Sequence, residues 1–312
     1  MNDAAIFDVV IVGGGPIGIY GCYLAAIKGL KPCLIEASDT LGGQPSVLYP
    51  QKYIYDFPYF AKIKAHDLIA GLYQQLLTQK DKIVIKTNCE VVNYAFNDAI
   101  YTLTLNNQTT IATKNIIIAS GTGKFNPNKL SISFPEKINQ HLHYFVADIN
   151  FFKNKKVVIC GGGDSAVDWA NELKEKQITD HVTIIHRRDQ FRANGENVER
   201  LTKNRVNLVL NQQIAAINEQ AIVTDQNQTI PYDEIIVQYG QAIDLNNLGF
   251  IPTIKFDQLK KIQVDQSMHT NLPNIYACGN ACNYPNKPGT IIPGMGEIAV
   301  AINSIINSLK KY

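Results

Sequence analysis

The 312-residue sequence predicts an α/β protein in which one domain with a parallel sheet is inserted into another of the same kind. Two stretches with the same pattern support this, VVIVGGGPIG at 9–18 and VVICGGGDSAVDWA at 157–170. Each is an apolar, β-branched run followed by glycines and a helical pattern. A further apolar strand, LPNIYACGN at 272–280, follows the second copy late in the chain. Because the strand, glycine turn and helix begin a Rossmann fold, we expect two nested Rossmann-like dinucleotide-binding domains.

The first unit begins with a strand at 6–12, which is apolar throughout, as expected for a parallel strand buried on both faces. Residues 13–18 turn the chain, and small and apolar residues at 17–29 predict a helix. A second strand, KPCLIEA at 31–37, places Glu36 at its end. The order is strand, turn, helix and strand, with an acid closing the unit.

The second unit repeats this order later in the chain, with a strand at 155–160, a turn at 161–166, a helix at 164–176 and a strand at 181–188. Between the units, 115–127 reads as a buried strand that runs into a glycine-rich turn. Short alternating segments occupy 205–240, and 296–312 predicts a closing helix. Since we expect the last strand and helix to return to the first unit, the sequence predicts a discontinuous first domain at 1–114 and 242–312, and a second domain inserted into it at 115–241.

The first glycine turn has the spacing of a dinucleotide-binding loop. Gly13 permits the tight bend, Gly15 lets the backbone approach a pyrophosphate, and Gly18 lets helix and strand pack closely. The helix N-terminus then offers free N–H groups and the positive end of its dipole to the phosphates. Glu36 follows Gly18 by eighteen positions, the place of a carboxylate that binds a ribose hydroxyl.

The second turn differs from the first in two places. Its third small residue is Ala166 rather than glycine, and the strand that follows ends in basic residues rather than in an acid. The turn carries the candidate nucleotide contacts Gly161, Gly163, Asp164, Ser165 and Ala166. Instead of an acid, the following strand ends in the basic candidates His186, Arg187 and Arg188, with Arg192 one turn later. Arginines pair with a 2′-phosphate that a carboxylate would repel, so this site is predicted to take NADPH in preference to NADH. The economical pair of cofactors is FAD in the domain at 1–114 and 242–312, the FAD-binding domain, and NADPH in the domain at 115–241, the NADPH-binding domain. The predicted chemistry is then hydride transfer from nicotinamide to flavin.

Composition and charge exclude several classes of protein. Hydrophobic residues make up 46% of the chain and charged residues 18%, which is typical of a globular protein. The net charge of +2 gives no reason to expect nucleic acid or an acidic membrane surface as a partner. Asp3 and Asp8 interrupt the apolar N-terminus, and no run of about 18 apolar residues occurs. We therefore expect a cytoplasmic protein without a membrane span.

The six cysteines are scattered, without a CxxC pair or zinc-ligand spacing, and lie at Cys22, Cys33, Cys89, Cys160, Cys278 and Cys282. Scattered cysteines of this kind usually act as small hydrophobic core residues in a protein of a reducing compartment. We expect no metal site. The CxxxC spacing of Cys278 and Cys282 is weak evidence for redox chemistry, and we favour a structural role. Hydride transfer needs no side-chain acid or base, so no catalytic residue is predicted.

In its two glycine turns and in the HRRDQFRA run at 186–193, the chain resembles the thioredoxin-reductase-like flavoproteins, and among them the bacterial ferredoxin–NADP reductases. The similarity runs nearly end to end and is most specific at 41–58, 121–130, 143–170 and 294–303. The resemblance implies FAD contacts at Glu36, Gln44, Tyr49, Cys89, Phe125, Asn280 and Met295. Tyr49 would lie against the isoalloxazine ring, although a half-buried core tyrosine is an alternative. The PGMGE motif at 293–297 would open a helix whose N-terminus faces the flavin.

Thioredoxin reductases of this fold carry a redox CxxC before the second glycine strand, but the corresponding stretch here, HYFVADINFFKN, has no cysteine. Electrons must then leave the flavin for an external acceptor, and the resemblance implies ferredoxin or flavodoxin, small acidic carriers, and a homodimer. Two departures affect the flavin site. Asn280 stands where the family usually has Asp, and the chain stops at Tyr312 without the usual covering tail, which predicts a more open flavin.

Two other functions stay open at the level of sequence. One is a general NADPH-dependent reductase of free flavins, quinones or small disulfides. The other is a nucleotide-binding sensor without catalytic activity, which the intact glycine turns and arginines argue against.

Overall fold

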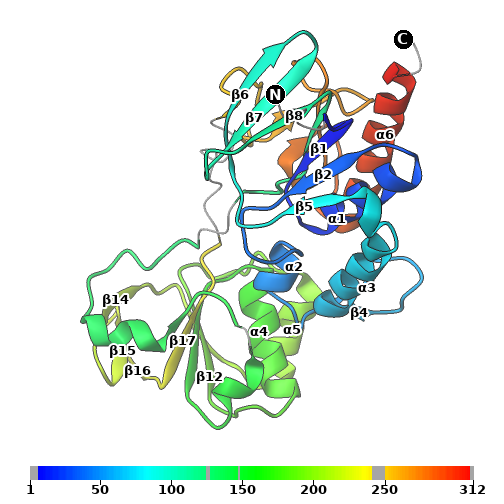
Figure 1. The fold of residues 1–312 in the computed structure, drawn as a ribbon. Coiled ribbons are helices and arrows are strands. Elements are labelled where there is room, and N and C mark those ends of the chain that lie inside the picture. The colour runs from blue at the N-terminus through cyan, green and yellow to red at the C-terminus, as the bar shows by residue number, and fades with distance from the viewer. Residues whose placement is uncertain (1–5, 124–126, 147, 241–249, 310–312) are drawn as a thin grey trace. The chain divides into compact units, whose positions relative to one another are not determined.

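The chain folds into two compact units, and Figure 1 shows the elements of each. The structure is a computed structural model that describes residues 6–123, 127–146, 148–240 and 250–309. Unit 1 comprises Met1–Phe125 and Ile243–Tyr312, and unit 2 comprises Asn126–Ala242. The first boundary lies after Phe125 rather than after residue 114 because the strand Ile116–Ile118 pairs within the sheet of unit 1.

The main sheet of unit 1 is fully parallel. Its strands in spatial order are β19 (Ile275–Ala277), β9 (Ile116–Ile118), β1 (Val9–Val12), β2 (Pro32–Ile35) and β5 (Val84–Lys86). The three central strands are β-branched or apolar nearly throughout, as burial on both faces requires. The order reverses direction between β1 and β9, and such a switch point is where ligands bind beyond the carboxyl ends of the strands.

Three helices pack with one face of this sheet: α1 (Pro16–Ile27), α3 (Ala65–Leu77) and α6 (Ile291–Leu309). Helices α1 and α6 cross closely because Gly21 has no side chain, and a Cβ there would come 2.5 Å from Ile298. Helix α6 is long and apolar enough to span a membrane by composition alone. However, Ile298, Ile302 and Ile305 are fully buried in the core of unit 1, which accounts for the apolar character of α6.

Smaller elements complete unit 1. An antiparallel sheet consists of β6 (Val91–Asn97), β7 (Ile100–Leu105) and β8 (Thr110–Thr113). Two-stranded pairs join β3 (Tyr53–Ile54) to β4 (Ile63–Lys64) and β18 (Ile262–Gln263) to β20 (Cys282–Asn283). Short helices are α2 (Gln44–Val47) and the 3-10 turns η1 (Lys80–Lys82) and η5 (Gly279–Ala281).

Unit 2 repeats the parallel architecture. Its strands in spatial order are β10 (Leu142–His143), β17 (Glu234–Val237), β11 (Val157–Cys160), β12 (Val182–His186) and β13 (Asn207–Leu210). Helices α4 (Asp164–Glu175) and α5 (Gly195–Lys203) pack side by side (Figure 1). The remaining elements are an antiparallel sheet of β14 (Ile214–Ile217), β15 (Ala221–Thr224) and β16 (Thr229–Pro231), and the 3-10 turns η2 (Glu136–His141) and η3 (Ile149–Phe152).

The predicted fold class, two Rossmann-like units with one inserted into the other, is confirmed. The closing helix differs from the prediction in its start, because α6 begins at Ile291 rather than at Gly296. The PGMGE motif therefore lies within the first two turns of α6, close to the helix start that the sequence predicts for it.

Candidate cofactor sites

The first glycine turn packs directly on the neighbouring strand. Gly13 has φ of +110°, and a Cβ there would lie 2.6 Å from the Ala119 carbonyl oxygen, just beyond β9. A Cβ on Gly18 would lie 1.8 Å from the Gly13 carbonyl oxygen. Both positions therefore require glycine for close backbone contact, as the sequence predicts.

The N-terminus of α1 is open in the way that a phosphate site requires. The N-cap residue is Gly15, no side chain caps the helix, and Pro16 occupies its first turn. A Cβ on Gly15 would meet no atom within 4 Å. Since helix N–H groups need acceptors and the dipole favours an anion, these residues fit a pyrophosphate.

Glu36 lies beside this turn at the end of β2. Its Oε2 accepts a hydrogen bond of 2.6 Å from the Gly14 N–H, and its Oε1 accepts one of 2.7 Å from the Ser38 N–H. Each carboxylate oxygen keeps a further lone pair for a ribose hydroxyl. Cys89 reaches this region through its backbone, because its N–H donates to the Glu36 carbonyl at 3.0 Å while its side chain is buried.

Two more predicted flavin contacts, Gln44 and Tyr49, lie on the segment that follows β2. The Gly42 N–H donates to the Gly14 carbonyl at 2.8 Å, and this holds the segment against the turn. Gln44 donates to Thr122 Oγ1 at 2.7 Å. Tyr49 is half-buried, and burial raises the pKa of its phenol, so the ring is neutral at physiological pH. Phe125 lies outside the described residues.

The last predicted flavin contacts, Asn280 in η5 and Met295 in α6, belong to segments that meet the start of α1. A Cβ on Gly294 would come 2.6 Å from Ile17 Cδ1 and 3.2 Å from the Gly279 Cα. Asn280 and Met295 are both half-buried. The described flavin candidates therefore come from segments that adjoin the first glycine turn or the start of α1.

A buried ionic cluster that the sequence analysis missed supports the η5 turn. Glu297 accepts 2.7 Å and 2.8 Å hydrogen bonds from the Gly279 N–H and the Tyr284 hydroxyl. Lys287 donates to Glu297 at 2.8 Å and to the Gly279 carbonyl at 2.6 Å. The Lys287 and Glu297 side chains are only 2% and 3% exposed. Lysine and glutamate are seldom this buried unless paired, and no local pattern marks them in the sequence.

The two cysteines of the CxxxC pair are buried beside this cluster. Burial, opposed by the nearby Lys287 ammonium, raises the pKa of the Cys282 thiol to about 11. Burial also raises the pKa of Cys278 well above its usual value. Thiolates are the reactive form, so both side chains are unreactive thiols at neutral pH, which favours the structural role.

The second glycine turn repeats the geometry of the first. Gly161 has φ of +148°, and a Cβ there would lie 2.4 Å from the Gln238 carbonyl oxygen, just beyond β17. The N-cap residue of α4 is Gly163, and no side chain caps this helix. A Cβ on Gly163 would meet no atom within 4 Å. Asp164 and Ser165 are exposed at this end, and Ala166 is buried. This N-terminus also fits a pyrophosphate.

The basic candidates after β12 divide into two groups. Arg187, Arg188 and Arg192 are exposed. His186 is buried instead, with its ring stacked on Phe191 at a centroid distance of 5.5 Å. The ring fills the space beside Gly162, where a Cβ would come 2.3 Å from it. The buried histidine ring therefore packs under residues 187–194, which we call the basic loop, while its arginines are exposed and can face an anion.

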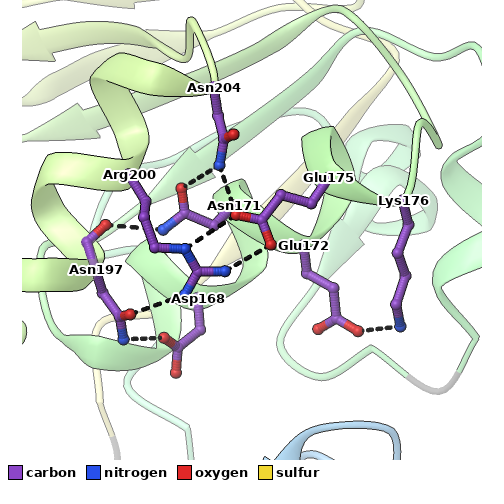
Figure 2. Close-up of polar contacts among 8 residues, drawn as sticks. All are labelled: Asp168, Asn171, Glu172, Glu175, Lys176, Asn197, Arg200 and Asn204. Atoms are coloured by element: carbon purple, nitrogen blue, oxygen red, sulfur yellow. Dashed lines mark hydrogen bonds and ion pairs between the residues drawn. The ribbon is translucent and has the colours of Figure 1, made fainter.

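Helix α5 holds the other end of the basic loop, and Figure 2 shows how α5 is fixed to α4. Arg200 Nε donates to Glu175 at 3.0 Å, and Asn204 donates to Asn171 at 2.9 Å. Before α5, the Asn194 N–H donates to Asp164 at 3.0 Å. These contacts, with a 2.8 Å bond from the Arg192 N–H to Gly162, tie the loop to the glycine turn.

The buried His186 predicts a pH dependence for unit 2. Burial, together with the positive charges of the three arginines, lowers the pKa of His186 below its usual 6.5, although a Gln190 carbonyl partly opposes this. Because the unfolded chain then binds a proton that the folded unit rejects, stability is complete above about pH 6.5 and is lost as the pH falls below it. Trp169, the single tryptophan, lies in α4 and reports on unfolding of this unit.

We expect the unfolding midpoint, followed by Trp169 fluorescence, to decrease when the pH is lowered from 7 to 5.5. The decrease should be smaller in His186→Phe. The phenylalanine keeps an aromatic ring against Phe191 but does not titrate. Equal falls in both proteins would assign the pH dependence to other groups.

Comparison with known proteins identifies the family of this chain. Residues 7–304 match the pyridine nucleotide-disulphide oxidoreductase family. The chain belongs to this family. A ferredoxin–NADP reductase of Malacoplasma penetrans is 38% identical over all of this chain and 99% of that protein. Ferredoxin–NADP reductase 2 of Bacillus cytotoxicus is 37% identical over 96% of this chain and 92% of that protein.

Among solved structures, a thioredoxin reductase of Lactococcus lactis superposes with a TM-score of 0.82 at 25% identity, covering 98% of this chain and all of that one. The family, with its thioredoxin-reductase-like fold, implies FAD and NAD(P) as cofactors. Two glycine turns with open helix N-termini meet that requirement, one in each unit.

Proposed function

We propose that this protein is an NADPH-dependent FAD enzyme that passes electrons to ferredoxin or flavodoxin. The observation that carries the proposal is the contrast between the two units: an acid follows the first glycine turn and exposed arginines follow the second. Full-length relatives that bear the name ferredoxin–NADP reductase support the same activity.

We assign FAD to unit 1 and NADPH to unit 2. In unit 1, the N-terminus of α1 would hold the pyrophosphate, Glu36 the adenosine ribose, and Tyr49 the flavin ring. In unit 2, the N-terminus of α4 would hold the pyrophosphate, and Arg187, Arg188 and Arg192 the 2′-phosphate.

Bound FAD supplies a centre that accepts two electrons as hydride and releases them singly. The balance is then one NADPH oxidised to NADP⁺ for two carriers reduced by one electron each, with one proton released. The protein residues bind and orient the two nucleotides, and no side chain is required to transfer a proton.

The test is anaerobic mixing of the purified protein with NADPH, and separately with NADH, while flavin absorbance is followed. We expect rapid bleaching with NADPH and much slower bleaching with NADH, and then reduction of added ferredoxin or flavodoxin. Bound flavin that NADPH does not bleach would contradict the reaction. Bleaching followed by reduction of quinones or free flavins only would favour the general reductase.

We also propose a homodimer in the cytoplasm. The dimer rests on resemblance to the ferredoxin–NADP reductases, and the location on six cysteines that are all buried and free. Analytical ultracentrifugation tests the dimer, and fractionation of cells that express the tagged chain tests the location.

A further inference from the structure

The segment 52–64, which contains the β3–β4 pair, exposes an unusual number of aromatic side chains. Tyr59 is 96% exposed, Tyr55 is 68% exposed and Phe60 is 39% exposed. The Tyr59 and Phe60 rings meet edge to face with a centroid distance of 5.0 Å. Exposed aromatic clusters of this kind are typical of protein-binding surfaces, where tyrosine is enriched. We call this segment the aromatic hairpin.

The backbone of Tyr59 is strained. Its φ is +81°, in the left-handed region that bulky side chains seldom adopt. The nearly complete exposure of this ring means that the fold gains little burial in return. Strain held without a gain in packing is characteristic of functional positions. We expect a partner protein to supply the missing burial when it covers the Tyr59 ring.

The charges of the aromatic hairpin are mostly positive. Lys52, Lys62 and Lys64 stand against a single acid, Asp56. The Lys62 ammonium lies 4.7 Å from the centre of the Tyr53 ring, and Lys64 donates to the neutral Gln51 at 3.2 Å. A surface that combines lysines with exposed aromatic rings is complementary to an acidic protein.

The aromatic hairpin is also continuous with the proposed flavin site. The Lys52 N–H donates to the Tyr49 carbonyl at 3.0 Å, and the Lys52 ammonium lies 6.0 Å from the centre of the Tyr49 ring. The His66 N–H, just after β4, donates to the Pro50 carbonyl at 2.9 Å. Both ends of the hairpin are therefore bonded to the backbone beside Tyr49.

We propose that the aromatic hairpin is the docking surface for the acidic electron-carrier protein, with Tyr59 as its anchor. This inference rests on the proposed function and adds the place where the carrier binds. Lys62 and Lys64 would attract the acidic carrier, and the Tyr59 ring would be buried on contact. Small interfaces of this type suit transient electron-transfer complexes.

The test uses the FAD-loaded enzyme with NADPH, a purified bacterial ferredoxin and, in parallel, flavodoxin. Tyr59→Gly removes the ring and suits the left-handed backbone. We expect this variant to raise the KM for both carriers about tenfold, to leave ferricyanide reduction unchanged, and not to lower the unfolding temperature.

Lys62→Glu should raise the KM for the carriers and weaken its dependence on ionic strength, because an attractive charge becomes repulsive. The control is Lys80→Glu, the same charge change at an exposed site of η1 in unit 1, which should change neither.

The outcomes separate this inference from the proposed function. If the wild type reduces both carriers and the hairpin variants keep its KM, docking at the hairpin is wrong while the function stands. If NADPH bleaches the flavin but neither carrier is reduced, the function is wrong and the docking site with it. A change of sedimentation in Tyr59→Gly without a change of KM would assign the hairpin to a contact between two copies of this chain, which also contradicts the proposal.

Discussion

Replacing Arg187 and Arg188 together with alanine is expected to lower kcat/KM for NADPH by about a hundredfold and to change that for NADH less than threefold. Hydrogen bonds to charged groups contribute about 1.5–3 kcal/mol each, and each 1.4 kcal/mol is a factor of ten. Only NADPH carries the 2′-phosphate that these guanidinium groups would bind. Steady-state kinetics with ferricyanide as acceptor measures both constants.

The exposure of both side chains makes this a test of binding rather than of folding. The loop itself stays tied to the glycine turn through the Arg192 N–H and through Asp164, neither of which changes. Lys203→Ala, which removes an exposed charge from the last turn of α5, is the matched control and should leave both nucleotides unaffected. A parallel loss for NADPH and NADH would mean that the arginines orient the loop and do not select the phosphate.

The elements of both units could be predicted because their signals are local. The apolar runs at 9–12 and 157–160 are short, rich in β-branched residues and followed by glycines, which together predict buried strands and the turns after them. The acid after β2 and the arginines after β12 follow from the same local reading. Glu36 accepts from the Gly14 N–H in the first turn, and the Arg192 N–H donates to the Gly162 carbonyl in the second.

The features that the sequence did not reveal depend on contacts between distant segments. The strand at 116–118 reads as an isolated apolar run, and only its pairing with β1 and β19 assigns it to unit 1. His186 looks like part of a basic surface, but its neighbours Gly162 and Phe191 bury it. Tyr59 gives no sign in the sequence of its left-handed backbone.

The buried pair of Lys287 and Glu297 leads to the largest stability effect that we expect. Lys287→Met should destabilise unit 1 by about 3–5 kcal/mol, because it leaves the Glu297 carboxylate buried without its counter-charge. The Gly279 carbonyl would lose a partner as well. Urea unfolding followed by far-UV circular dichroism measures the loss, and Trp169 fluorescence, which reports on unit 2, should not shift.

A surface pair in the same unit gives the matched control. Lys114 lies 2.9 Å from Asp8, but their side chains are 43% and 18% exposed, so Lys114→Met should cost less than about 1 kcal/mol. The double variant Lys287→Met with Glu297→Gln should recover part of the loss, since no unpaired charge is then buried. If Lys287→Met costs no more than Lys114→Met, the cluster does not stabilise the η5 turn through its charges. The position of Asn280 beside the first glycine turn would then depend on the packing of Ile17 against Gly279 and Gly294 alone.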